Sequence, residues 1–143
     1  MGAPGLVVVT HGRLAEELVN ATRTIVEDFD ALEAVSIGWD DDPVDARRRI
    51  EEAIRRVDRG HGVLVFTDMF GGTPTNLALS FLDAGRVEVV TGVNLPMLIK
   101  VTNLRDEAGF SERARRVAEQ GRQAIQVASD LLRKGEGAPG EKP

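Results

Sequence analysis

Two polar side chains with complementary chemistry follow two short apolar runs of the sequence. His11 comes directly after Leu6–Thr10, and Asp68 comes two residues after Gly62–Phe66. If these runs form neighbouring strands, both side chains lie at one edge of a sheet and can hydrogen-bond. A carboxylate that holds one imidazole nitrogen fixes the tautomer and leaves the other nitrogen with a free lone pair. The pair is therefore typical of a nitrogen nucleophile, with His11 reacting and Asp68 orienting it.

A glycine-rich loop follows Asp68 and leads into an expected helix. Gly71, Gly72 and Thr73 would offer backbone N–H groups to an anion, and a helix N-terminus adds positive potential. Phosphoryl transfer depends mainly on positioning and on such donors, and the hydroxyls of Thr73 and Thr75 could add to them. We therefore expect a phosphate-binding loop next to His11. A loop histidine, a turn aspartate and a plain helix entry remain the alternative interpretation of these residues.

The elements that position these loops alternate between strand and helix. Strands are predicted at Leu6–Thr10, Ala34–Ile37, Gly62–Phe66 and Val87–Val90. Helices are predicted at Leu14–Val26, Pro43 to about Arg59, Leu95 to about Val101, and Glu112–Glu119 with Ser111 as its cap. A further helix is predicted to begin with Thr73 as its cap and Pro74 as its first residue. This alternation predicts an α/β fold with a doubly wound, mostly parallel sheet flanked by helices. Residues 121–132 fit either a strand or a helix.

Ligands of such a sheet bind beyond the carboxyl ends of the strands. The rule selects the loops at residues 10–13, 67–75 and 91–96. His61 precedes the third strand, so we expect it at the opposite edge of the sheet. Asn94 either shapes the rim of the crevice or only begins a helix.

The composition limits the classes of protein that the chain can represent. Its 143 residues predict one domain over residues 1–134 and a flexible tail over residues 135–143. The net charge of -5 argues against nucleic-acid binding, and the lack of cysteine excludes disulfides and thiolate sites. No leader and no membrane-spanning apolar run is recognisable, which favours a cytoplasmic location.

Several other sites are disfavoured by their spacing. No GxxxxGK[ST] or GxGxxG pattern follows a strand, and no serine lies in the three loops, so neither a nucleotide cofactor nor a serine hydrolase is expected. The run from Asp40 to Asp42 fits a turn and helix cap better than a metal site. The arginines at 47–49 fit a solvated helix face with ion pairs at i,i+4, such as Arg47 with Glu51. We expect no cofactor and no metal.

Three apolar side chains in or near these loops have two interpretations each. Met69 and Phe70 either cover the pocket and contact a partner or belong to the core. Trp39 either lines the same surface or occupies an amphipathic strand end.

The sequence resembles a known family through three segments in the same order. These are VVVTHG at 7–12, VLVFTDMFGGTPTNLA at 63–78 and TGVNLPML at 91–98. They are similar to the mannose-type enzyme IIA domains of the bacterial phosphoenolpyruvate-dependent sugar phosphotransferase system, and the match runs in register from about Leu6 to Leu132. The resemblance implies that His11 is phosphorylated by the histidine phosphocarrier protein HPr and passes the group to a IIB component.

The same resemblance implies the roles of the neighbouring residues and the assembly. Asp68 would support the histidine, and Gly71, Gly72 and Thr73 would form the phosphate loop. A homodimer is implied in which a short strand around Gln123–Ala128 is exchanged between subunits, followed by a last helical turn. Longer homologues continue into a IIB domain, so here IIB would be a separate protein or absent, and peripheral association with a membrane permease stays open. The alternatives are a regulatory module switched by phosphorylation of His11 and a binding pocket for a small anion without transfer.

Overall fold

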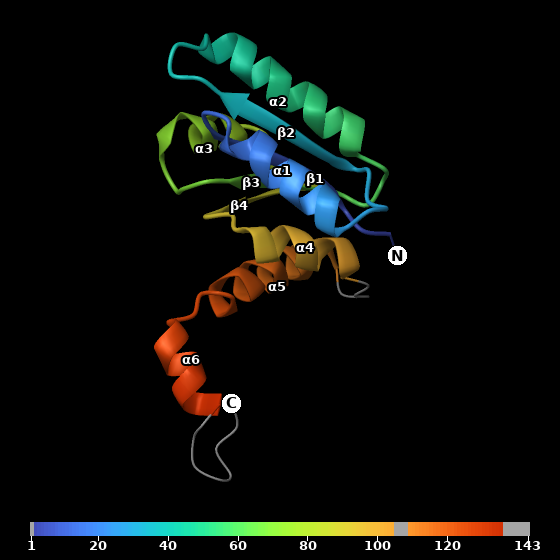
Figure 1. Cartoon of the computed structure of the whole chain (residues 1–143). Coiled ribbons are helices and arrows are strands. Elements are labelled where there is room, and N and C mark those ends of the chain that lie inside the picture. Colours follow the sequence, from blue (N-terminus) through green and yellow to red (C-terminus); the bar gives the residue numbers. More distant parts are fainter. Residues whose placement is uncertain (1, 105–108, 136–143) are drawn as a thin grey trace.

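A four-stranded parallel sheet forms the centre of the molecule (Figure 1), which is described by a computed structural model over residues 2–104 and 109–135. The strands are β1 (Gly5–His11), β2 (Leu32–Ile37), β3 (Val63–Thr67) and β4 (Val87–Thr91). Their order is β2-β1-β3-β4, and every neighbouring pair is parallel. Each lies where the sequence predicts a strand, because short β-branched runs buried on both faces are typical of parallel sheets.

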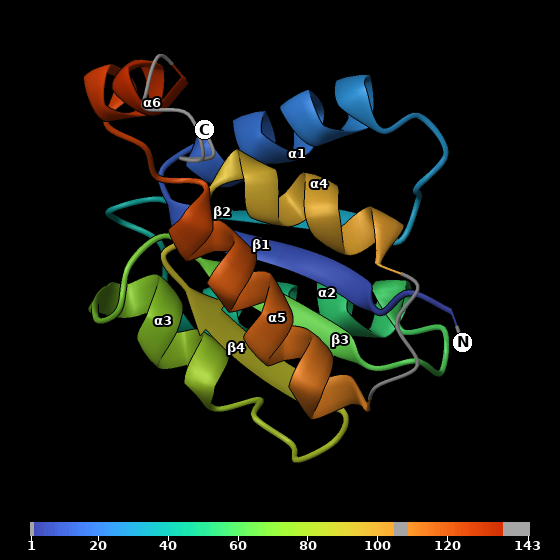
Figure 2. The same ribbon diagram turned by 90° about the horizontal axis from the view of Figure 1, so that it is seen from below.

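Helices cover both faces of this sheet. They are α1 (Leu14–Ile25), α2 (Pro43–Val57), α3 (Gly72–Leu79), α4 (Leu95–Asn103), α5 (Phe110–Gln123) and α6 (Ala128–Gly135). Figure 2 shows α1, α4 and α5 on one face, with α2 behind the sheet. Helix α3 belongs to the face of α2, because its Ala78 packs in the same core cluster as Ile50. The side chains of β1 alternate between the two faces, so that Leu6 and Val8 pack with α1 and α4, while Val7 and Val9 pack with α2. The predicted doubly wound α/β fold is confirmed.

Two helices begin earlier than predicted. The N-cap of α3 is Gly71 rather than Thr73, because glycines at positive φ turn the chain into the helix before Thr73 is reached. Pro74 then falls in the third position of α3, where its missing N–H leaves no helical hydrogen bond unmade. The N-cap of α5 is Gly109 rather than Ser111, and Phe110, its first residue, packs over Gly62.

The two edges of the sheet differ. On the outer edge of β2, the carbonyl oxygens of Leu32 and Ser36 accept hydrogen bonds from Arg23 and Arg49. The edge at β4 instead borders a hollow of about 340 Å³ between β4 and α5, lined by residues that include Val89. On the outer edge of β4, Val87 forms an antiparallel bridge with Asp83, and the backbone N–H of Val89 donates to Glu88 Oε2. Each edge is therefore covered only in part, and unpaired strand edges invite strand addition where such contacts are lacking.

Residues 125–135 stand apart from the sheet. Residues 125–127 have no regular secondary structure and pair with no strand among the described residues, and α6 extends away from the other helices (Figures 1 and 2). The helix expected after this segment is therefore present, whereas the exchanged strand stays a prediction. The tail expected at 135–143 lies, apart from Gly135, outside the described residues. No helix in the described ranges is long and apolar enough to span a bilayer.

Candidate active site at the carboxyl ends of the parallel strands

The loops after β1 and β3 leave the sheet side by side. The chain after β1 turns to β2, and the chain after β3 turns the opposite way to β4. A reversal of this kind opens a crevice between the two strand ends, which is where doubly wound sheets bind ligands. His11 is the last residue of β1, and Asp68 follows β3 directly. The fold therefore brings together the two residues that the sequence singles out.

Asp68 binds His11 through a single carboxylate oxygen. Its Oδ2 atom accepts a hydrogen bond from the backbone N–H of His11 at 3.0 Å and lies 2.8 Å from the imidazole Nδ1. The side chain of Asp68 is 14% exposed and that of His11 is 26% exposed, so the pair is shielded but still reachable from solvent. The double contact fixes both the position of the histidine backbone and the rotation of its ring.

The charge of Asp68 determines which imidazole nitrogen is free. Burial raises the pKa of Asp68, but hydrogen bonds from the His11 backbone and ring outweigh this effect and hold the pKa below its ordinary value of 3.8. At neutral pH the carboxylate is thus ionised and can only accept hydrogen bonds. The proton of a neutral imidazole is therefore assigned to Nδ1, which leaves the lone pair on Nε2.

The free nitrogen faces the start of α3. A Cβ atom built on Gly72 would lie 3.0 Å from both Nε2 and Cε1 of His11. Gly72 is the first residue of α3, and Gly71 is its N-cap, with φ values of 84° and 94°. The first N–H groups of a helix have no partner within the helix. The start of α3 at Gly72 thus lies beside Nε2, and exposed Thr73 follows it directly.

Threonine hydroxyls support the site from within the fold. Thr75 is fully buried, and its hydroxyl bonds to the carbonyl of Met69 and to Thr67 Oγ1. The expectation that Thr75 donates to a phosphate is therefore wrong, because this hydroxyl ties the loop to β3. Thr10 Oγ1 accepts a hydrogen bond from Ala15 N at 2.7 Å and so fixes α1 to the end of β1. This role of Thr10 and Thr67 does not follow from helix and strand periodicity; buried threonines at strand ends are the sequence signal that could have indicated it.

Trp39 stands beside the histidine on the side of β2. Its ring centroid lies 5.5 Å from that of His11, with the planes tilted by 36°. Trp39 is nevertheless 86% exposed, and Phe70 and Met69 are 79% and 53% exposed. Exposure excludes the core alternative for Met69 and Phe70, and the ring contact with His11 places Trp39 at the surface of the site.

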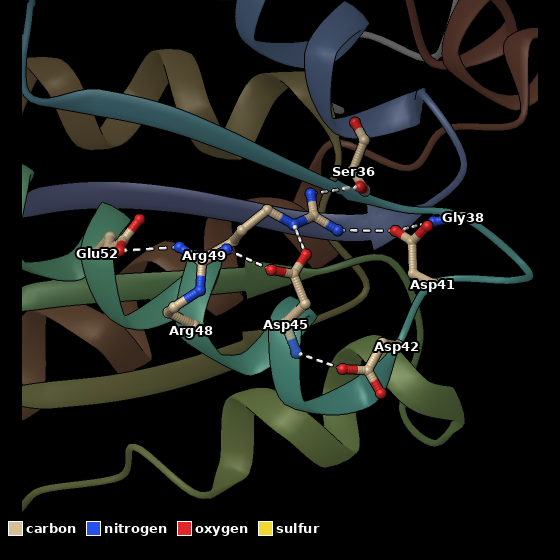
Figure 3. Close-up of polar contacts among 8 residues, drawn as sticks. All are labelled: Ser36, Gly38, Asp41, Asp42, Asp45, Arg48, Arg49 and Glu52. Atoms are coloured by element: carbon tan, nitrogen blue, oxygen red, sulfur yellow. Dashed lines mark hydrogen bonds and ion pairs between the residues drawn. The ribbon is translucent and has the colours of Figure 1, made fainter.

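An ion pair holds the loop that carries Trp39. Asp41 Oδ2 accepts a hydrogen bond from the backbone N–H of Gly38 at 2.8 Å and lies 2.7 Å from Nη2 of Arg49 (Figure 3). Asp42 caps α2 by accepting from Asp45 N at 3.2 Å. The turn-and-cap interpretation of these aspartates is confirmed. The positioning role of Arg49 was missed, because helical spacing alone pairs it only with residues of its own helix.

The remaining candidates serve the fold. His61 contacts Gly2 at the opposite edge of the sheet from His11, as expected. Asn94 caps α4 through Met97 N and also donates to the carbonyl of Gly121, so the helix-start interpretation is confirmed.

The predicted arginine face of α2 is confirmed only in part. Arg48 pairs with Glu52. Arg47 instead bonds to Ser80 Oγ and lies over the ring of Phe81. The expected pair of Arg47 with Glu51 is wrong, because α3 and the residues after it offer Arg47 nearer partners across the helix packing. Among the described residues, no group of three or more histidine or carboxylate side chains could hold a metal ion.

Comparisons with known proteins agree with this geometry. The family model for the "PTS system fructose IIA component" matches residues 5–118. A fructose-specific EIIA component of the phosphotransferase system of Bacillus subtilis is 28% identical over 130 residues, which cover 90% of this chain and 89% of the relative. The mannose-specific EIIAB component of Escherichia coli is 31% identical over 129 residues, and the match covers 85% of this chain but only 38% of that longer protein.

A solved structure extends the agreement to the fold. The mannose/sorbose-specific IIA subunit of Enterococcus faecalis superposes with a TM-score of 0.77 at 29% identity, over 89% of this chain and 95% of that one. The matched region of the family model contains both strand ends that carry His11 and Asp68. The chain therefore belongs to the fructose- and mannose-type IIA family of the phosphoenolpyruvate-dependent sugar phosphotransferase system.

Proposed function

We propose that the protein is a phosphocarrier that accepts a phosphoryl group from phospho-HPr on Nε2 of His11 and passes it to a IIB component. Proteins of this family are phosphotransferases. The observation that carries the finer proposal is the contact between Asp68 Oδ2 and Nδ1 of His11, because it leaves Nε2 free at the start of α3. Exchange with these partners would take place in the cytoplasm.

The proposed transfer needs no cofactor. The lone pair of Nε2 attacks the phosphorus atom of the donor phosphohistidine, and the donor P–N bond breaks with its electron pair returning to the donor nitrogen. Nδ1 keeps its proton throughout, and the Asp68 carboxylate stabilises the positive charge that develops on the ring. Transfer to IIB repeats the exchange in the opposite sense, with the acceptor nitrogen attacking the phosphorus on Nε2.

The start of α3 would bind the transferred group. The Cβ position of Gly72, the first residue of α3, lies beside Nε2 of His11. The backbone N–H groups of Gly72 and Thr73 and the turn at Gly71 would therefore be the donors nearest the phosphoryl group. Oriented backbone donors are effective for phosphoryl oxygens because they require little reorganisation during the transfer. A regulatory module that is only switched by phosphorylation of His11, and a pocket for an anion without transfer, remain alternatives that no observation favours.

The assembly that the family resemblance implies is a homodimer. Two features support it: β4 is the last strand of the described sheet and beyond it only Val87 is bridged, to Asp83, and Ile125 and Val127 are 75% and 63% exposed. A strand from a second copy that adds to β4 would cover these apolar side chains. The exchange would leave the site at His11 unchanged.

The phosphocarrier proposal is tested with purified components. The protein is incubated with enzyme I, HPr and phosphoenolpyruvate, and its intact mass is recorded before and after mild acid, with His11→Ala alongside. We expect one acid-labile phosphoryl group on the wild-type protein and none on the variant. Full labelling of His11→Ala would overturn the assignment of the residue, and no labelling of the wild-type protein would overturn the proposed function.

A further inference from the structure

Three exposed apolar side chains flank the proposed nucleophile. Trp39 lies on the β2 side of His11, and Met69 and Phe70 lie in the loop after β3; we call these three residues the apolar rim. Large aromatic side chains exposed to this extent do little for the stability of the free chain. Such clusters beside a reactive group are typical of protein interfaces, in which aromatic residues and methionine are enriched.

The structure holds Trp39 in place although it is exposed. Gly38 and Asp41, on either side of it along the chain, are joined by a hydrogen bond, and Arg49 anchors Asp41 to α2 (Figure 3). Arg49 also donates to the carbonyl of Ser36 in β2 at 3.1 Å, so strand, loop and helix are connected through one side chain. A surface that is already ordered loses less conformational entropy on binding. The loop is thus built to present its tryptophan.

Two of the loops around the apolar rim are acidic, while the loop after β1 carries exposed Arg13, which pairs with Glu16. Residues 38–42 and 68–73 contain the carboxylates of Asp40, Asp41, Asp42 and Asp68 and no basic side chain. Asp41 is paired with Arg49, and Asp42 caps α2, while Asp40 is exposed. A partner that brings a phosphoryl group to this surface meets repulsion from these carboxylates. It therefore needs apolar contact area and basic groups of its own to bind.

We propose that the apolar rim is the docking surface for the phosphoryl-donor protein, with Trp39 as the anchor that the donor buries next to His11. The donor would carry an apolar patch beside its phosphohistidine and basic side chains that face Asp40. The inference rests on the proposed function and names the surface that it uses. The donor is the partner concerned because a protein that carries a phosphoryl group needs basic side chains beside it, and such side chains would complement exposed Asp40 at the apolar rim.

The fluorescence of Trp39 gives a direct test. The chain contains one tryptophan and no tyrosine, so tryptophan emission reports this side chain alone. Unphosphorylated HPr is titrated into the wild-type protein and into His11→Ala, and the emission maximum and quenching by acrylamide are recorded. We expect a blue shift and weaker quenching in both proteins. Unchanged emission and quenching at HPr concentrations that saturate phosphoryl transfer would overturn the docking surface.

Transfer kinetics separate docking from a structural role. Trp39→Ala should raise the KM for phospho-HPr by roughly 5- to 30-fold, as truncation of an anchoring aromatic does, with little change in kcat. Trp39→Phe should recover part of the loss. Ile25→Ala is the matched control, since Ile25 is 54% exposed but ends α1 at the opposite edge of the sheet.

The outcomes distinguish this inference from the proposed function. Absence of phosphorylation in the wild-type protein would overturn the proposed function and the docking surface with it. Normal phosphorylation together with an unchanged KM in Trp39→Ala would overturn the docking surface alone. A decrease in kcat with an unchanged KM would likewise contradict docking, because it would indicate that Trp39 only positions the ring of His11.

Discussion

Nε2 of His11 lies 3.0 Å from the point that a Cβ atom on Gly72 would occupy. Gly72 also has a φ of 84°, a conformation that side chains with a Cβ adopt only at a cost. The absence of a side chain therefore allows two things at once: the backbone turns into α3, and the imidazole rests against the first residue of that helix. The distance between the reactive nitrogen and the helix start depends on this one glycine.

Gly72→Ala should therefore slow phosphorylation of His11 more than it destabilises the fold. The new methyl group would displace the imidazole, while the backbone strain would cost about 1–2 kcal/mol of stability. Gly60→Ala is the matched control, because Gly60 has a φ of 89°, has no neighbouring side chain or backbone within 4 Å of its Cβ position, and precedes β3 at the opposite edge of the sheet from His11. Both variants are compared by urea unfolding and by single-turnover labelling with phospho-HPr. Equal labelling rates in the two variants would contradict the role given to Gly72.

Asp68→Asn should slow phosphoryl transfer without unfolding the protein. The amide is neutral and no longer stabilises positive charge on the ring of His11, and it can bind the ring in either tautomer. A hydrogen bond to a charged group is worth about 1.5–3 kcal/mol, which corresponds to a rate reduced roughly 10- to 100-fold. Single-turnover transfer from phospho-HPr measures the effect. A wild-type rate in this variant would show that the carboxylate does not support the reaction.

The contribution of Asp68 to stability should depend on pH. Its pKa in the folded protein lies below the ordinary value of 3.8, so the folded state favours the ionised form. The stabilisation is thus fully present at neutral pH and is lost as the pH falls below about 3.8 towards the folded pKa. The free energy of unfolding of wild type minus Asp68→Asn should be constant near neutrality and shrink in acid. Asp28→Asn, which replaces an exposed carboxylate distant from His11, provides the control.

The sequence predicts the architecture and the central pair because both follow from chain order. Alternating strands and helices require parallel pairing, and the reversal of direction after β1 and β3 brings their ends together. His11 and Asp68 needed only to follow the correct strands in order to meet. Once the two strand ends are neighbours, the side chains are close enough to hydrogen-bond, and no particular packing of other elements is required.

The contacts that sequence analysis missed depend on packing between elements that are distant along the chain. Arg49 bonds to Ser36 across the edge of β2, and Arg47 lies over Phe81 after α3. Neither contact follows from helical periodicity, which relates a residue only to neighbours on its own helix. The buried position of Thr75 likewise follows from how α3 packs on β3. The positive φ values of Gly71 and Gly72 determine where α3 begins, whereas capping preferences alone favour Thr73 as the N-cap.

Arg49→Ala should loosen the loop that carries Trp39. The ion pair with Asp41 is partly exposed and contributes about 0.2–1 kcal/mol to stability, so the fold should persist. The tryptophan fluorescence anisotropy should fall, and the KM for phospho-HPr should rise. Arg48→Ala is the matched control, because Arg48 pairs with Asp45 and Glu52 within α2 and makes no ion pair with the loop (Figure 3). Equal anisotropy in the two variants would exclude a positioning role for Arg49.

Charges at Ile125 and Val127 should dissociate the proposed dimer. Residues two apart in a strand point to the same side, so these side chains would face the same surface of the partner subunit if residues 125–127 pair with β4 of the other copy. The double variant Ile125→Asp with Val127→Asp would bury two carboxylates there, which is strongly unfavourable. Light scattering should then give a mass near the 15.5 kDa of one chain instead of about twice that value.

Ile25→Asp provides the control for this change in mass, since Ile25 is exposed on the other side of the fold and should leave the dimer intact. Phosphorylation of His11 in the double variant gives a second measurement. Because His11, Asp68 and Gly72 come from one chain, the monomer should still accept a phosphoryl group from phospho-HPr. A wild-type mass near one chain would contradict the dimer, and a monomeric variant that fails to be labelled would show that the second subunit completes the site.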